Sequence, residues 1–249
     1  LNNVILFGQN TFEGTAITEI DLSGATKLGS NLFKDCKNLT KVVLCDKLEE
    51  LPNYMFSGCT SFTGVEMGAD GNPVMNEDGS YKYTLDLPES LIHMGQYTFK
   101  DTNIIAIKIP ENVTDLTDKL AKAKVDAKHG DYNAVSEAFS GCTKLVSVIF
   151  ESNKVEHVGK NAFYLCESLE EILMPDPDNE GKYTADRFFQ QLKFAGDGAF
   201  KGTGIKKVVL DSAERFGNEL FMDSAVEEVY ISTSITANGG KQQGWGSKM

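Results

Sequence analysis

Several features that mark a membrane-spanning or metal-binding protein are missing from this sequence. No apolar run approaches the roughly 18 residues that a helix needs to cross a bilayer. There is no Cys-x-x-Cys pair and no grouping of cysteine with histidine, so a zinc site is not expected. No leader peptide is visible. Because Leu1, Val4 and Leu6 are spaced like a short strand, we expect the chain to begin inside a longer protein.

The motifs of common enzyme classes are missing as well. The sequence has no Gly-x-Ser-x-Gly, no phosphate-binding P-loop and no Gly-x-Gly-x-x-Gly after a strand. Acidic residues are so abundant that two neighbouring carboxylates do not indicate a glycosidase. We therefore expect neither catalysis nor a cofactor.

Basic residues are in the minority. The chain has 24 Lys and Arg against 36 Asp and Glu, which gives a net charge of −12. Nucleic acids and anionic membrane surfaces bind to clustered basic residues, so we expect neither as a partner. The acidic residues are spread along the chain, which is typical of a solvated surface.

What the sequence does contain is one sequence motif that is repeated eight times. A Phe is followed three residues later by Cys, Thr or Ser, and then by a short apolar strand. The eight anchors are Phe12, Phe33, Phe56, Phe99, Phe139, Phe163, Phe200 and Phe221. Such self-similarity predicts a solenoid, in which each unit buries its apolar face against its neighbours. The three longest intervals between anchors require insertions, or units that have lost the Phe.

The residue three positions after each anchor occurs in two versions. Four units have cysteine there: Cys36, Cys59, Cys142 and Cys166. The other four have a hydroxyl residue, and one residue fewer before the next apolar position: Thr15, Thr102, Thr203 and Ser224. We expect the hydroxyl to bond backbone in a tighter turn and the cysteine to be a small buried filler. Pairing of neighbouring cysteines as disulfides is the alternative, which parallel side-chain directions disfavour.

A second pattern precedes each anchor. Four residues upstream stands Gly, or Pro in one unit, which predicts a tight turn with φ > 0. The residue before it is apolar, and in the Phe139 unit Ala134 and Val135 fill these two slots. His93 and His157 share the slot six residues upstream, but the Phe139 unit separates them by roughly 10 Å. That distance is too long for shared metal ligation.

Three segments do not fit the repeat. Residues 68–84 and 175–191 resemble each other and are predicted as hairpin-like loops, whereas residues 117–132 have a loose helical pattern. Insertions in a solenoid often carry recognition, so Tyr81, Tyr83 and Tyr183 are candidate loop contacts. Tolerated loop growth explains the insertions equally well. Their Asp- and Asn-rich turns lack the spacing of a calcium loop.

Each predicted strand also has one residue that should face outward between the last two core positions. These residues are Ile5, Asp21, Val43, Glu66, Lys108, Ile149, Leu173, Val209 and Tyr230. Most of them are apolar or aromatic, so aligned strands would expose an apolar strip, which often marks an interface. The candidate interaction residues are Val43, Ile149, Leu173, Val209 and Tyr230. In the alternative, the insertions fold over this strip.

These units resemble a known family. The residues that carry the resemblance are Val155, Val158, Gly159, Ala162, Phe163, Cys166, Leu169, Ile172, Met174 and Pro175. They follow the BspA-type leucine-rich repeat of bacterial surface proteins. The resemblance implies a curved, right-handed, mainly β solenoid with short strands on one side and loops and turns on the convex side. It also implies an exported protein with a role in adhesion or in binding other proteins, and it transfers no catalytic residue.

The prediction is therefore one leucine-rich-repeat solenoid over residues 1–249, interrupted near 68–84, 117–132 and 175–191. We expect a non-catalytic recognition module outside the cell or at its surface, which binds a host, matrix or neighbouring-cell protein. One alternative is glycan binding, for which Tyr81, Tyr83, Tyr183 and Trp245 offer stacking surfaces. The other is a passive spacer that carries a further domain.

Overall fold

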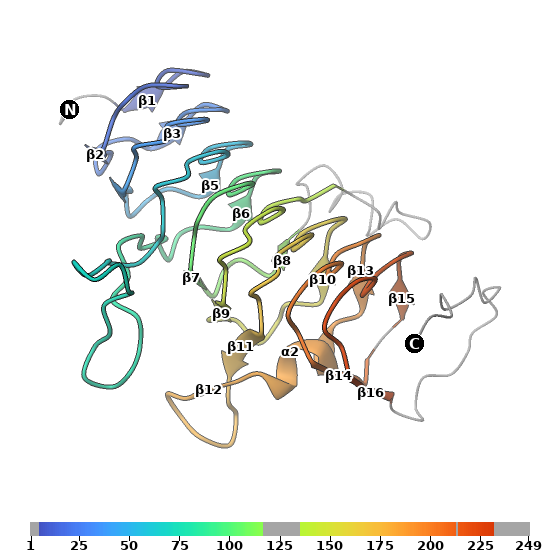
Figure 1. The fold of residues 1–249 in the computed structure, drawn as a ribbon. Helices are drawn as coiled ribbons and strands as arrows, with labels where there is room; N and C mark the ends of the chain where they lie inside the picture. Colours follow the sequence, from blue (N-terminus) through green and yellow to red (C-terminus); the bar gives the residue numbers. More distant parts are fainter. Residues whose placement is uncertain (1–4, 117–134, 213, 232–249) are drawn as a thin grey trace.

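The computed structural model describes residues 5–116, 135–212 and 214–231, and the chain forms a stack of coils (Figure 1). A column of phenylalanine rings runs through the stack. Each anchor ring stacks on the next from Phe12 to Phe221, with centroids 5.3–5.8 Å apart. Because Phe56 stacks directly on Phe99, and Phe99 on Phe139, the long intervals hold insertions and no additional coil.

The strands that follow the anchors form one side of the stack. They are β2 (Glu19–Asp21), β4 (Lys41–Val43), β7 (Ala106–Ile109), β9 (Ser147–Phe150), β11 (Glu171–Pro175), β14 (Lys207–Leu210) and β16 (Glu228–Ile231). They pair in parallel, in three separate sheets: β2 with β4, β7 with β9 and β11, and β14 with β16. Alternate side chains point into the core, as Val148 and Ile172 do, and this is the mainly β repeat fold that the sequence predicts.

A second row of strands lies where the sequence predicts only turns and loops. Each strand has two residues: β1 (Leu6–Phe7), β3 (Lys27–Leu28), β5 (Glu50–Leu51), β6 (His93–Met94), β8 (Asp115–Leu116), β10 (His157–Val158), β13 (Phe194–Ala195) and β15 (Arg215–Phe216). The second residue of each strand is the apolar one that precedes the Gly or Pro slot. Two residues are too few to show an alternating pattern, which is why these strands were not predicted.

The strand of the Phe139 unit corrects the sequence alignment. β8 pairs with β10, so Asp115 and Leu116 hold the places that were assigned to Asn133 and Ala134. The insertion in this unit therefore starts after Leu116, between this strand and the anchor. The predicted helix at 117–132 lies outside the described residues. His93 and His157 belong to different coils with the Asp115 strand between them.

The glycine that stands four residues before six of the eight anchors has a different role from the predicted one. None of these glycines has a positive φ. A Cβ on Gly29 would lie 2.4 Å from the backbone of Gly8, and a Cβ on Gly196 would lie 2.4 Å from the backbone nitrogen of Lys160. Glycine is needed here because the coils approach closely, and left-handed geometry occurs elsewhere in the turn.

Two other positions in each coil do adopt left-handed geometry, two residues before and two residues after the anchor. The first set is Asn10, Asn31, Tyr54, Tyr97, Glu137, Asn161, Gly198 and Glu219. The second set is Gly14, Asp35, Gly58, Asp101, Gly141, Leu165, Gly202 and Asp223. Asn, Asp and Gly tolerate this conformation, whereas Leu, Tyr and Glu adopt it at a cost.

The cysteine and hydroxyl versions of the repeat use different hydrogen bonds. The Thr15 hydroxyl donates to the carbonyl of its own anchor, Phe12, at 2.9 Å. The Cys36 thiol donates to the same carbonyl, which belongs to the preceding coil, at 2.8 Å. Cys59, Cys142 and Cys166 repeat this bond to the coil before them. The hydroxyl hydrogen bond predicted within the turn is therefore present. All five cysteines are free thiols, and the four in the repeat each add a hydrogen bond between coils.

The first and third insertions interrupt the longer-strand side of the stack. After residue 175 the chain turns into β12 (Tyr183–Thr184), which pairs antiparallel with β11, and then into α2 (Asp186–Gln191). This helix was not predicted. Phe188 is fully buried and stacks on Phe150 with ring centroids 5.6 Å apart, so α2 fills the core where β11 and β14 do not pair. No described helix is both long and apolar enough to cross a membrane.

Candidate functional surface

Seven of the nine predicted outward-facing residues lie in the strand row. Ile5 does not, because β1 belongs to the second row of strands, and Glu66 lies in no named strand. Lys108 is in register with Ile149, which is in register with Leu173. On the last sheet, Val209 is in register with Tyr230. The parallel pairing therefore brings side chains that are far apart in the sequence onto one face.

The row is not one continuous exposed strip. Val43 and Tyr230 are 42% and 53% exposed, whereas Ile149, Leu173 and Val209 are each partly buried. The row is also divided among the three sheets. Both protruding insertions leave the stack on this side (Figure 1), and Tyr83 of the first insertion lies against Lys108 of the row. The available surface thus combines strand residues and insertion residues.

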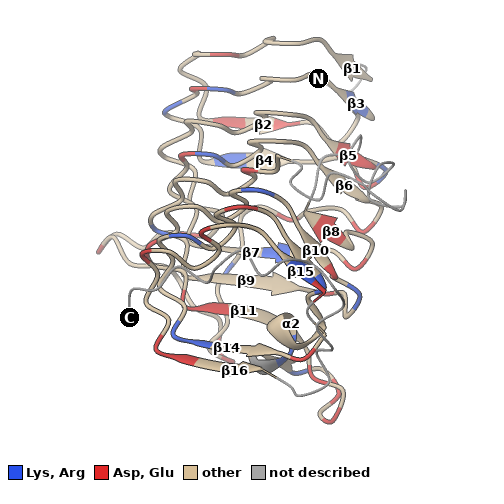
Figure 2. Cartoon of the chain, turned by 90° about the vertical axis from the view of Figure 1, so that its right-hand side faces the viewer, with Lys and Arg blue, Asp and Glu red and all other residues tan. Residues whose placement is uncertain are grey.

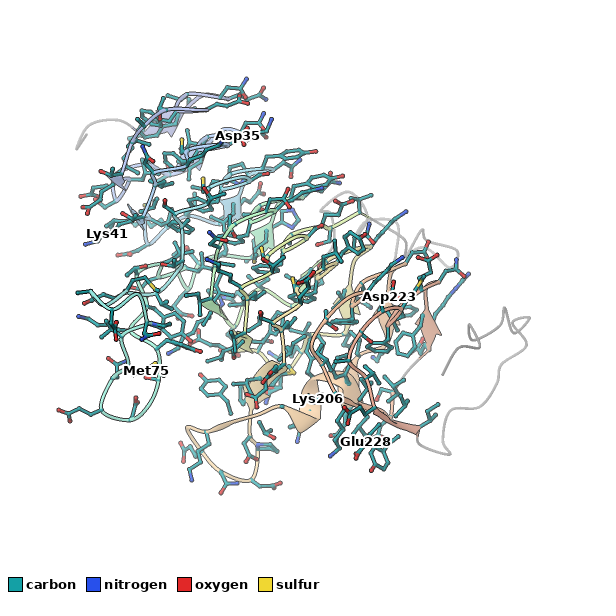
Figure 3. All side chains as sticks on the ribbon, in the orientation of Figure 1. Asp35, Lys41, Met75, Lys206, Asp223 and Glu228 are labelled. Atoms are coloured by element: carbon teal, nitrogen blue, oxygen red, sulfur yellow. The ribbon has the colours of Figure 1, made fainter. Side chains whose placement is uncertain are left out.

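The first insertion is more ordered than a hairpin. Backbone N–H groups of Glu66, Val74 and Lys82 form a closed ring of three hydrogen bonds: Glu66 donates to Lys82, Lys82 to Val74 and Val74 to Glu66, at 2.8–2.9 Å. Three short extended segments therefore pair with one another. Met67 and Met75 are 39% and 48% exposed on them. Figure 3 shows Met75 on the part that projects beyond the coils.

Tyrosines from both insertions gather around the outer face of β7. The Lys108 ammonium lies 5.1 Å from the ring centroid of Tyr83, and Tyr81 meets Tyr83 edge-on at 6.4 Å. Partial burial, followed by the nearby Tyr81, Tyr183 and Glu151, raises the pKa of Tyr83 to about 12. Tyr183 is 38% exposed on β12. All three candidate loop tyrosines thus belong to one neighbourhood.

Acidic side chains surround this neighbourhood. Burial raises the pKa of Glu151, and the negative charges of Glu89 and Glu111 add to that effect. The pKa of Tyr183 is also raised, by burial and then by Glu151 and Glu89. We call the group formed by Tyr81, Tyr83, Tyr183, Lys108 and Glu151 the tyrosine surface. It offers aromatic edges, one ammonium group and one carboxylate, a combination that suits binding.

A groove of about 250 Å³ lies beside Val209, between the starts of β11 and β14. Glu171 borders it on β11, Lys207 on β14, and Phe189 of α2 also lines it. Charge alternates along these strand starts, because Lys207 is in register with Glu228 on β16 (Figure 2). Cross-strand pairs of this kind stabilise a sheet by a few tenths of a kcal/mol to about 1 kcal/mol.

The loops with calcium-like composition hold their own hydrogen bonds. The Asp176 carboxylate accepts from the Asn179 side chain at 2.7 Å and from the backbone of Asp178 at 2.9 Å. These bonds lower the pKa of Asp176, and bonds from Asn72 do the same for Asp70. Within the described part of the chain, no three His, Cys, Asp or Glu residues are placed to hold a metal ion.

Comparison with solved structures places the fold among bacterial leucine-rich repeat proteins. A leucine-rich repeat protein from Bacteroides ovatus matches with a TM-score of 0.51 at 20% identity, over 92% of this chain and 64% of that one. The chain thus spans less than two thirds of that protein. A leucine-rich repeat protein of T. pallidum matches with a TM-score of 0.41 at 22% identity, over 67% of this chain and 72% of that one.

Sequence comparison gives the family. No curated protein sequence matches significantly. The model of the BspA type leucine rich repeat region matches residues 6–124 and 132–234, in six copies. These ranges contain all eight phenylalanine anchors, and the match covers most of the chain. The chain therefore belongs to the BspA-type leucine-rich repeat family.

Proposed function

We propose that this chain is a non-catalytic recognition module on a curved, right-handed solenoid, and that it binds a protein of the host, the matrix or a neighbouring cell. The binding surface is the tyrosine surface together with Val43 and Tyr230, the exposed residues of the strand row on the two flanking sheets. We place the module outside the cell or at its surface, in line with the family. It has no nucleic-acid partner and no cofactor.

One observation carries this proposal. Insertions about a hundred residues apart in the sequence put Tyr81, Tyr83 and Tyr183 in the same neighbourhood, above a strand row that is itself in register. Tyrosine gives a large contact area with little loss of side-chain entropy, which is why it is common in binding surfaces. Loop growth without a function would have no reason to bring aromatic residues together.

The test is a double variant, Tyr81→Ser with Tyr183→Ser, on arrays of matrix and host-cell proteins. We expect binding to at least one protein by the parent chain, and a loss of tenfold or more in the variant. Tyr164→Ser is the matched control, because Tyr164 is partly exposed on a coil turn away from both insertions. Parent binding that the double variant leaves unchanged, with the fold intact by circular dichroism, would refute the proposal.

Glycan binding is the second candidate. Tyrosine rings can stack on sugar faces, and the carboxylate of Glu151 can accept hydrogen bonds from sugar hydroxyls. The same variants on an oligosaccharide array separate the two classes. Binding to sugars alone, lost in the double variant, would favour the glycan. A parent chain that binds nothing on either array would favour the spacer.

A further inference from the structure

A hollow lies on the edge of the stack that is opposite the insertions. It has a volume of about 420 Å³ and is lined by residues of the coils anchored by Phe163, Phe200 and Phe221. The Phe163 coil has the longer cysteine turn, whereas the next two have the turn that is one residue shorter. A Cβ on Gly202 would lie 2.9 Å from Cδ2 of Leu165, and a Cβ on Gly204 would lie 2.8 Å from the Glu167 carbonyl oxygen, so glycine lets the coils approach closely at this edge.

Leu165 lines this hollow in an unfavourable conformation. Its φ is 57°, at the position where every other coil has Gly or Asp. Gly suits this geometry and Asp tolerates it, but for leucine the left-handed region is strained. Leu165 is nevertheless 37% exposed, so its side chain gains little from burial in the core. The residue thus costs backbone strain and still presents an apolar side chain to solvent, a combination found at functional positions.

The charges around the hollow have one sign. Glu167 and Asp223 both line it, and both are exposed. Across the described ranges neither carboxylate forms an ion pair. The neighbouring Lys201 is held by Glu219, with its ammonium 2.8 Å from the Glu219 carboxylate. The hollow therefore has an apolar wall and two carboxylates, and Lys201, the cation near Asp223, is paired with Glu219 and does not line the hollow.

We propose that this hollow binds a basic side chain of a partner protein, with arginine preferred. The aliphatic stem of the arginine packs on Leu165 and Ala225, and its guanidinium lies between the carboxylates of Glu167 and Asp223. Arginine combines an apolar stem with a planar, weakly hydrated cation that donates to carboxylates in a fixed geometry. In Figure 3 Asp223 lies on the same edge as Asp35, away from Met75, so this site is separate from the tyrosine surface.

The test uses short capped peptides and NMR titration of the whole chain. We expect acetyl-Gly-Arg-Gly-amide to shift the amide signals of the hollow, and the lysine peptide to bind at least threefold more weakly. The citrulline peptide has nearly the same shape without the charge and should not bind. Equal binding of the citrulline and arginine peptides, or no shift at the hollow with the arginine peptide, would overturn the proposal.

Variants assign the roles. Glu167→Gln and Asp223→Asn should each weaken arginine binding at least threefold, whereas Asp35→Asn, at the same turn position in another coil, should not. Leu165→Gly should melt no lower than the parent chain, because glycine suits the φ of this position, and yet bind at least fivefold more weakly. A Leu165→Gly chain that binds the arginine peptide as the parent does would remove Leu165 from the site. An Asp35→Asn effect equal to that of Asp223→Asn would show a non-specific charge effect and refute the site.

Discussion

At the scale of single residues, one carbonyl position explains why the repeat has two versions. The carbonyls of six of the eight anchors accept a hydrogen bond from a hydroxyl in the same coil, from a thiol in the next coil, or from both, as at Phe12 and Phe99. Phe56 and Phe163 are the exceptions, because each has a cysteine in its own coil and a threonine in the next. The Thr102 hydroxyl and the Cys142 sulfur are also 3.4 Å apart. Cysteine therefore does more than fill space, because it links neighbouring coils through a buried hydrogen bond. The alternation between cysteine and a hydroxyl residue is visible in the sequence, but the hydrogen bonds that explain it are not.

The same environment makes these thiols unreactive. Burial raises the pKa of Cys142 to about 12, and those of Cys59 and Cys166 are also raised by burial. The thiolate is the reactive form, so at pH 8 these three residues should react with a disulfide reagent only through unfolding. We expect these three thiols of the native chain to remain unlabelled on a timescale of minutes, as mapped by mass spectrometry, and all five thiols to react rapidly in guanidinium.

The raised thiol pKa values also make the stability of the fold depend on pH. Because the folded pKa values lie above the unfolded value of about 8.5, the protonated thiols stabilise the fold fully below that pH. That contribution falls as the pH rises from about 9 towards 12. Native-state labelling of Cys142 at pH 8 without loss of circular dichroism would contradict the burial argument.

At the scale of elements, the long repeated patterns could be predicted from the sequence, whereas the short elements could not. The Phe spacing and the apolar strand pattern predicted the stack and the longer strands, because each is repeated eight times. The two-residue strands are too short to show a period. In the Phe139 unit the insertion hid the correct alignment, because Leu116, before the insertion, fills the slot that was assigned to Ala134, after it. Helix α2 has six residues, too few for a helical pattern to be distinguished. The row of in-register strand residues could be predicted, whereas the exposure of each residue in it depends on where the insertions lie.

Helix α2 is held by its core contacts, because it has no side-chain cap. Phe188 is fully buried between Phe150 and Phe200. We expect Phe188→Ala to lower the free energy of unfolding by about 3–5 kcal/mol, the usual loss for a buried phenylalanine. Lys182→Ala is the control in the same insertion, since Lys182 is exposed and should change stability by less than about 0.5 kcal/mol. Urea denaturation measures both, and equal effects of the two variants would show that α2 does not fill the core.

At the scale of the whole molecule, stability and recognition belong to different parts of the chain. In a solenoid each coil is stabilised mainly by its neighbours. Phe56 and Phe99 stack at 5.3 Å although 42 residues separate them, so the first insertion is not needed to hold these coils together. The insertion instead presents Tyr81, Tyr83 and Met75.

The excision of this insertion tests that division. Glu66 donates its backbone N–H to the carbonyl of Lys82 at 2.8 Å, so the two strands can be joined by a two-residue Asn-Gly turn in place of residues 67–81. We expect the shortened chain to fold with a melting temperature within about 5 °C of the parent, since the loss of the exposed loop removes little core. Binding through the tyrosine surface should fall tenfold or more, whereas arginine binding at the Leu165 hollow should not change. A shortened chain that fails to fold would show that the insertion supports the stack, and one that keeps full binding to the protein partner would move recognition away from the tyrosines.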